Sequence, residues 1–165
     1  MKVSAYRKEF DREGFECGID ELDFYLKRNL SQDIRRNAAS CFVLHEAGES
    51  KILGYYTLSA FSVRLDGLPE TERKTLPRYP QVPMTLLGRL AIALESQGKG
   101  LGELLLMDAL KRAWENREVI ASWAVAVDAI NEDARNFYLR YGFEMFEATD
   151  SRLFLPMKRI GKLFG

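Results

Sequence analysis

The chain has 165 residues, of which 47% are hydrophobic and 29% are charged, and its 24 basic residues balance its 24 acidic ones. This length and composition favour a single domain over residues 1–165 with its own hydrophobic core, and they exclude a wholly disordered chain. The zero net charge excludes a global basic field, so any contact with nucleic acid must come from local clusters.

The first half of the chain predicts short strands around an amphipathic helix. Leu22, Leu26 and Leu30 fall on one face of that helix, and Asp20 is available to cap it. Alternating and continuous apolar runs predict the strands. We predict strands at residues 3–6, 40–46 and 52–63, and helices at residues 19–29 and about 31–37.

The second half predicts an α/β alternation after one long irregular segment. Residues 64–83 hold four of the five prolines, which is typical of a lid or a binding loop. Gly142 stands where a helix-ending glycine is expected. We predict strands at residues 83–92, 120–127, 143–146 and 152–157, and helices at residues 102–115 and 131–140.

A glycine-rich stretch, residues 97–102, joins an apolar strand to a strongly helical run. Gly98, Gly100 and Gly102 let the backbone turn tightly and approach a ligand closely. The N–H groups that open a helix lack intrahelical acceptors, so this element suits a phosphate or diphosphate. The glycines alone also allow a turn that binds no ligand.

Two familiar phosphate-binding patterns do not fit this stretch. A Walker loop needs Ser or Thr after Gly-Lys, but Gly100 follows Lys99. The dinucleotide fingerprint needs a different glycine spacing and an acidic residue about 20 positions later. A nucleoside triphosphatase and an NAD-binding enzyme are therefore disfavoured.

The stretch resembles motif A of the GCN5-related N-acetyltransferases, Gln/Arg-x-x-Gly-x-Gly/Ala, through Gln97, Gly100 and Gly102. A second block, residues 131–143, is similar to the family's Asn-x-x-Ala-x-x-Phe-Tyr-x-x-x-Gly-Phe segment. The resemblance implies an α/β single-domain fold. The central sheet of that fold is expected to be mixed and mostly antiparallel, with six to seven strands and about four flanking helices. It also implies acetyl-CoA as the acetyl donor.

Further blocks look like the acetyltransferase toxins of bacterial toxin–antitoxin pairs, at residues 15–18, 22–26, 54–59, 87–91 and 153–157. Those toxins acetylate the α-amine of aminoacyl-tRNA. This resemblance implies a block of translation, a cognate antitoxin protein and, by analogy, a homodimer. Two alternatives stay open: an acetyltransferase of small amines or protein N-termini, and an acyl-CoA-binding or antitoxin-binding module without turnover.

The resemblance also places acetyl-CoA along the strand at residues 88–92. A backbone N–H near Leu90 is expected to polarise the thioester carbonyl, and the loop is expected to hold the diphosphate. Asn131 is expected either to cap its helix or to bind an amide of the coenzyme. The expected cofactor-binding residues are Leu90, Ala91, Ile92, Gln97, Gly98, Lys99, Gly100, Leu101, Gly102 and Asn131.

Tyr138 is the expected catalytic acid for the departing CoA thiolate. A phenol with an ordinary pKa of about 10 is protonated at pH 7 and can donate a hydrogen bond. Phe137, the adjacent residue, is then expected to be the core member of the pair. The alternative is an ordinary helix tyrosine with its ring in the core.

No strong base is visible in the sequence. His45, the only histidine, is distant from both motifs and is expected to be structural or exposed, and the strand at residues 87–92 lacks a glutamate. A site without a base fits an α-amine, whose pKa of about 7.7 lies far below the pKa of about 10.4 for lysine. Glu95 or a chain of waters remains a possible base.

Arg89, Arg35 and Arg36 are the candidate substrate-binding residues. Arg89 either grips a phosphate of tRNA or CoA, or forms a surface ion pair. The other basic clusters have a second reading as solvated faces. They are Lys27 with Arg28, Arg73 and Lys74 with Arg78, and Lys158 and Arg159 with Lys162.

The remaining features point to a protein of the cytoplasm. No apolar run approaches the ~18 residues of a membrane span, and the residues after Met1 are charged rather than apolar. Cys17 and Cys41 are too few for a disulfide scaffold and, with one histidine, cannot build a zinc site. We expect reduced thiols, no metal and no membrane contact.

Overall fold

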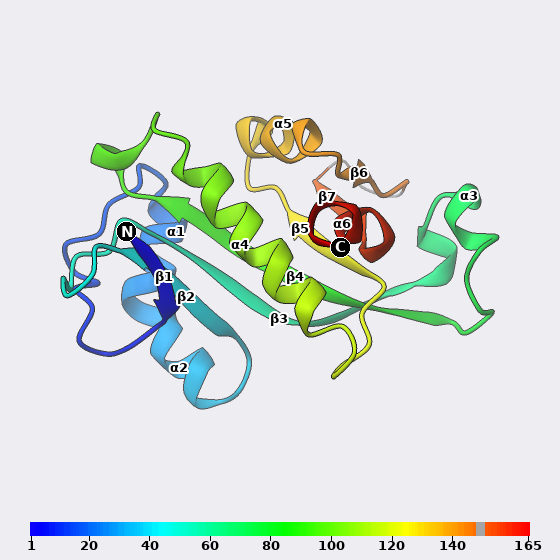
Figure 1. Ribbon diagram of the computed structural model, residues 1–165, viewed down its shortest axis with the longest axis horizontal. Helices are drawn as coiled ribbons and strands as arrows, with labels where there is room; N and C mark the ends of the chain where they lie inside the picture. Colours follow the sequence, from blue (N-terminus) through cyan, green and yellow to red (C-terminus); the bar gives the residue numbers. More distant parts are fainter. Residues whose placement is uncertain (148–150) are drawn as a thin grey trace. The chain divides into compact units, whose positions relative to one another are not determined.

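The computed structural model describes residues 1–147 and 151–165, which contain one seven-stranded sheet in the order β1-β2-β3-β4-β5-β7-β6 (Figure 1). Strands β4 and β5 pair in parallel, whereas β1–β2, β2–β3, β5–β7 and β6–β7 are antiparallel. This confirms the expected mixed, mostly antiparallel sheet. The strands are β1 (Lys2–Ala5), β2 (Ser40–His45), β3 (Gly54–Arg64), β4 (Gln81–Ile92), β5 (Ala124–Asp128), β6 (Glu144–Met145) and β7 (Arg152–Pro156).

One helical run replaces the two separate helices predicted near the N-terminus. It consists of α1 (Asp20–Phe24), a π-helical turn η1 (Tyr25–Asn29) and α2 (Leu30–Arg35). The N-cap is Ile19 without a side-chain hydrogen bond, so Asp20 is the first helical residue and not the cap. Periodicity missed this continuity because a π turn shifts the apolar positions by one residue.

The other helices are α3 (Glu70–Arg73), α4 (Leu101–Glu115), α5 (Glu132–Arg140) and α6 (Met157–Phe164), with 3₁₀ turns η2 (Leu65–Gly67) and η3 (Leu94–Ser96). The segment predicted as irregular thus contains η2 and α3. The sequence prediction missed α6, and β5 begins four residues later than expected. Gly142, with φ +93°, ends α5 as predicted, because its N–H donates to Leu139 and that of Phe143 donates to Tyr138.

The described chain divides into two compact units. The first comprises residues 1–59 and 88–109, and the second comprises residues 60–87 and 110–165. In the first unit, Leu26 and Leu30 of the run from α1 to α2 share one apolar cluster with Val43 of β2, and none of the three is exposed. Each such buried side chain contributes about 1.5–3 kcal/mol. The Tyr55 hydroxyl donates to the Leu22 carbonyl (2.7 Å) and ties β3 to α1.

The second unit packs aromatic side chains around β5 and β7. The ring centroids of Phe146 and Phe154 lie 4.9 Å apart, and those of Trp114 and Phe164 lie 6.4 Å apart. Helix α6 follows directly from β7 and contacts it (Figure 1). Among the described helices, none combines the length and the apolar character that crossing a bilayer requires.

Candidate functional site

The glycine-rich loop lies between β4 and α4 in the first unit, where the sequence predicts it. Gly98 and Gly100 both have φ of +78°, a left-handed conformation that favours glycine. A Cβ added at either residue would meet no atom within 4 Å. The two glycines therefore serve the backbone conformation, and the space over the loop is open.

The start of α4 offers backbone donors to that space. The helical hydrogen-bond pattern begins where the Leu104 N–H donates to the Gly100 carbonyl in the loop (3.2 Å). The N–H groups of Leu101, Gly102 and Glu103 precede that bond, and the geometry of a helix start leaves such groups without intrahelical acceptors. Lys99 is exposed on the same loop. This open, donor-rich loop with one cation fits a diphosphate.

Gln97 has a different use from the one expected of it. Its side-chain nitrogen donates to the Cys17 and Ile92 carbonyls, each at 2.9 Å. Both donors of this amide are therefore committed to the chain itself. Gln97 holds the loop against two other segments rather than presenting its amide nitrogen to a ligand.

The strand that leads to the loop carries Leu90 and Ile92 half-buried and Ala91 buried. Gly54, on β3, lies so close that an added Cβ would stand 2.8 Å from the Ala91 carbonyl oxygen. Only glycine fits there, because real Cβ atoms do not approach backbone atoms that closely. This contact fixes the position of β4 just before the loop.

Arg89 stacks on an aromatic ring instead of forming the surface ion pair that was its alternative reading. Its guanidinium carbon lies 3.5 Å from the ring centroid of Tyr25, and no described carboxylate forms an ion pair with it. The Tyr25 hydroxyl donates to Asp33 (2.8 Å), and burial raises the pKa of Tyr25. A stacked guanidinium keeps its N–H edge available for a phosphate.

In the second unit, Asn131 is the N-cap of α5. Its side-chain oxygen accepts a hydrogen bond from Ala134 N (2.8 Å). The capping alternative is thus confirmed. The cap uses the amide oxygen only, so the side-chain NH₂ group is not part of it.

Tyr138 is the buried aromatic residue of α5. It is 6% exposed, and its ring packs against Phe143 at 5.3 Å and Phe137 at 5.3 Å. Phe137 is only half-buried, so the expectation that Phe137 is the core member of this pair is wrong. Burial raises the pKa of Tyr138 above its ordinary value of 10.0, which keeps the hydroxyl protonated at pH 7.

The side chains considered as bases are engaged elsewhere. His45 is 1% exposed, and its ring nitrogens bond the Ser4 hydroxyl and the Glu46 carbonyl, each at 2.8 Å. This confirms that His45 is structural. Glu95 forms an ion pair with Lys51.

The two thiols are buried and free of disulfides. Burial raises the pKa of Cys17 and of Cys41 to about 12, so neither is a thiolate nucleophile at pH 7. Within residues 1–147 and 151–165, no group of three or more potential metal ligands comes together.

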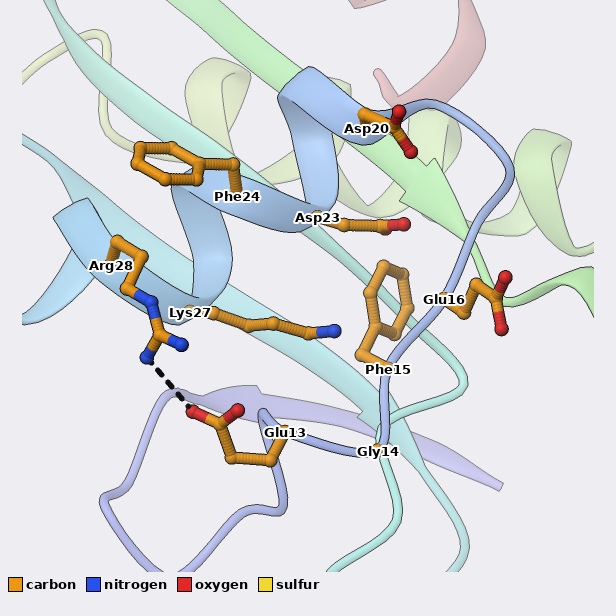
Figure 2. Close-up of a pocket in the computed structure, with 9 residues that line it drawn as sticks. All are labelled: Glu13, Gly14, Phe15, Glu16, Asp20, Asp23, Phe24, Lys27 and Arg28. Atoms are coloured by element: carbon orange, nitrogen blue, oxygen red, sulfur yellow. Dashed lines mark hydrogen bonds and ion pairs between the residues drawn. The ribbon is translucent and has the colours of Figure 1, made fainter.

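A hollow of about 380 Å³ lies beside α1 and was not foreseen from the sequence (Figure 2). Phe24 is among the lining residues drawn in Figure 2, and it is 60% exposed. The carboxylates in the lining outnumber the cations, so the hollow repels a phosphate and does not fit the diphosphate. The charged lining residues are Glu13, Glu16, Asp20 and Asp23, with Lys27 and Arg28.

The basic clusters differ in how far their charge is already offset. Arg28 pairs with Glu13 at 3.3 Å, and Arg159 pairs with both Glu72 and Glu144. Arg35 and Arg36, in contrast, are exposed at the end of α2, and no described carboxylate pairs with either. These two therefore stay open to a phosphate.

The family model described as "Acetyltransferase (GNAT) family" matches residues 4–143. The chain is 34% identical over 155 residues to a tRNA-acetylating toxin from Mycobacterium tuberculosis, covering 94% of this chain and 91% of that protein. Both matches span the glycine-rich loop and α5.

Two solved structures share the fold. AtaT complexed with acetyl-methionyl-tRNAfMet has a TM-score of 0.91 and 29% identity, covering 99% of each chain. AtaTR bound with acetyl-CoA has a TM-score of 0.88 and 28% identity, covering 99% of this chain and 98% of that one. Together with the family match and the diphosphate-binding geometry of the loop, these likenesses show that the chain belongs to the GNAT family of acetyltransferases.

Proposed function

We propose that this protein is a toxin that transfers an acetyl group from acetyl-CoA to the α-amine of aminoacyl-tRNA and thereby blocks translation. A loop shaped for a diphosphate is the observation that supports the coenzyme. The identity of 34% to a tRNA-acetylating toxin over nearly the whole chain supports the acceptor. Capping the α-amine makes the amino acid unable to accept a growing peptide.

The first unit supplies the coenzyme contacts in this proposal. N–H groups of residues 98–102 bind the diphosphate, and Lys99 offsets its charge. Leu90, Ala91 and Ile92 present their backbone to the pantetheine arm, in the manner of an added strand. The Leu90 N–H polarises the thioester carbonyl. The NH₂ group of Asn131, in the second unit, is left for an amide of the coenzyme.

Tyr138 supplies the proton for the leaving group. The amine nitrogen bonds to the acetyl carbon, the C–S bond breaks, and the amine's extra proton passes to solvent. Tyr138 donates its hydroxyl hydrogen to the sulfur as charge develops there and later regains a proton from solvent. Its burial supports this role because a protonated donor is present across the whole physiological pH range.

The absence of a free base among the candidates considered favours a weakly basic acceptor. An α-amine with an ordinary pKa of about 7.7 is partly neutral at pH 7, whereas lysine needs a base to lose its proton. His45 and Glu95 are both engaged in other contacts. This supports aminoacyl-tRNA over a lysine side chain.

Arg89, Arg35 and Arg36 are proposed to bind phosphates of the tRNA. Both units are proposed to form one acetyltransferase domain, because β3, β4 and α4 run through both of them. We further propose that the protein acts in the cytoplasm as a homodimer. A cognate antitoxin would restrain it, since an unrestrained block of translation would stop the growth of its own cell.

Purified protein with radiolabelled acetyl-CoA tests the proposal. The acceptors to compare are charged tRNA, the same tRNA without its amino acid, a polyamine and a peptide with a free N-terminus. We expect label on charged tRNA alone. Label on the polyamine or peptide instead would indicate an acetyltransferase of small amines or N-termini, and label on none would indicate a binding module.

A further inference from the structure

Thr57, on β3 in the first unit, carries a hydroxyl that the fold does not use. The residue is 1% exposed, yet its oxygen has no hydrogen-bond partner among the described residues. A buried hydroxyl without a partner lowers the stability of the fold by about 1–3 kcal/mol. Its presence therefore suggests a role outside folding. Within residues 1–147 and 151–165, only the Tyr6 hydroxyl is both sealed and unpartnered, so the unpartnered Thr57 oxygen keeps a small accessible area.

The opening is at Gly88, on the neighbouring strand β4. A Cβ added to Gly88 would lie 3.1 Å from the Thr57 hydroxyl oxygen and would meet no other atom within 4 Å. Gly88 is not among the residues with positive φ, so its backbone does not require glycine. The missing side chain therefore leaves room beside the Thr57 hydroxyl that a Cβ would fill.

One cation, Arg89, lies next to the opening at Gly88. Arg89 follows Gly88 directly and stacks on Tyr25. Burial raises the pKa of Tyr55, two residues from Thr57 on the same face of β3, and the charge of Arg89 opposes that rise only in part. A positive charge disfavours a second cation nearby and therefore favours the neutral form of a bound amine. A neutral hydroxyl beside a guanidinium is thus suited to an uncharged amine rather than to an ammonium group.

We infer that the Thr57 hydroxyl binds the neutral α-amine of the acceptor through the opening at Gly88, an inference that rests on the proposed acetyl transfer. The amine donates one N–H to the Thr57 oxygen, which turns its lone pair toward the thioester carbonyl. Alternate residues of a strand, such as 88 and 90, stand about 6.6 Å apart. The thioester carbonyl oxygen that accepts from the Leu90 N–H is therefore too far from the opening at Gly88 to bond Thr57 as well. Thr57 therefore holds the amine and Leu90 the carbonyl.

Thr57 itself is chemically unchanged by the reaction. The N–C bond forms and the C–S bond breaks as described for the proposed function, and the amine's proton goes to solvent. Thr57 orients the nucleophile, and the charge of Arg89 next to Gly88 disfavours its ammonium form. Together they take the place of the general base that the site lacks.

The test compares Thr57→Val, Thr57→Ser and Gly88→Ala. Valine keeps the shape and removes the hydroxyl, so kcat/KM for aminoacyl-tRNA should fall about tenfold while the Kd for acetyl-CoA stays unchanged. Serine should retain activity within about threefold. Gly88→Ala should resemble Thr57→Val, and the double variant should be no worse than either, because both block one hydrogen bond.

Thr85→Val is the matched control, since Thr85 lies on β4 and its hydroxyl is paired with Ser122 (2.9 Å). It should keep the wild-type kcat/KM. If Thr57→Val also keeps it, the inference is overturned, and the hydroxyl holds water only.

A second measurement separates this inference from the proposed function. Leucinamide, an α-amine without tRNA, is titrated by NMR into the wild type and the Thr57 variants with CoA present. Valine should weaken binding severalfold and serine should restore it. Equal binding overturns the inference. If the wild type acetylates no charged tRNA, the proposed function fails, and the leucinamide result still decides the role of Thr57.

Discussion

The loop at residues 97–102 and the helix α5 would contribute to acetyl transfer in opposite ways. The loop offers backbone N–H groups, and its glycines are needed for conformation, since Gly98 and Gly100 both have φ of +78°. Helix α5 offers one side chain, the buried Tyr138. Binding made by the backbone is insensitive to most side-chain changes, whereas chemistry made by one hydroxyl depends on that atom alone. Changes in the two regions should therefore affect different kinetic constants.

Removing the Tyr138 hydroxyl should have the largest effect. We expect Tyr138→Phe to lower kcat by ~10²-fold or more, because the departing sulfur loses its proton donor. The Kd for acetyl-CoA, measured by calorimetry, should change little, because the ring still fills the same space. Phe137→Leu is the control, since it alters a neighbouring ring that packs on Tyr138 without touching the hydroxyl. A fully active Tyr138→Phe variant would remove Tyr138 from the mechanism.

The pH profile tests the same hydroxyl without a mutation. Burial raises the pKa of Tyr138, so its proton-donor form persists above pH 10.0 and is lost only at still higher pH. The acceptor amine must lose a proton, so kcat/KM should rise about tenfold per pH unit below its pKa of about 7.7 and then level off. A fall in rate between pH 8 and about 9.5 would contradict the raised pKa of Tyr138, provided the protein stays folded there.

Gly100→Ala should affect binding instead. Alanine at positive φ costs about 1–2 kcal/mol, so the loop should distort and the Kd for acetyl-CoA should rise about tenfold with kcat nearly unchanged. Gly48→Ala is the control, because Gly48 has φ of +79° and an added Cβ there also meets no atom within 4 Å. It should lose similar stability without a change in Kd. Equal Kd values for the two variants would show that the loop does not bind the coenzyme.

The loop could be predicted from sequence because its signal is local. Three glycines between a strand and a helix specify a conformation through neighbouring residues alone, and the cap at Asn131 and the stop at Gly142 are local in the same sense. The α-helical period also located α4 and α5 within a residue or two.

The contacts that depend on distant residues could not be predicted. Tyr138 rather than Phe137 is buried because of how α5 packs on the rest of its unit, which periodicity over nine residues does not settle. Arg89 meets Tyr25 across 64 positions, and Thr57 meets Gly88 across 31. Nothing in the spacing of these residues signals that they are in contact.

Gln97 is predicted by a local motif but makes contacts that depend on distant residues. Its substitution should have the smallest effect on coenzyme binding and stability. The motif predicts Gln97 by its position, but its amide holds the loop by donating to the Cys17 and Ile92 carbonyls. Each bond contributes about 0.5–1.5 kcal/mol, less where water competes. Gln97→Ala should therefore lower the free energy of unfolding by about 1 kcal/mol and raise the Kd for acetyl-CoA about threefold.

Denaturant titration and calorimetry measure the two quantities, with Gln32→Ala as the control, since Gln32 is exposed on α2. If Gln97 contacts the coenzyme directly, the Kd rises while the free energy of unfolding stays at the wild-type value. If it holds the loop, both change together, and saturating acetyl-CoA restores kcat. The backbone would then be the binding surface, and the one conspicuous side chain of the motif would act by keeping that backbone in place.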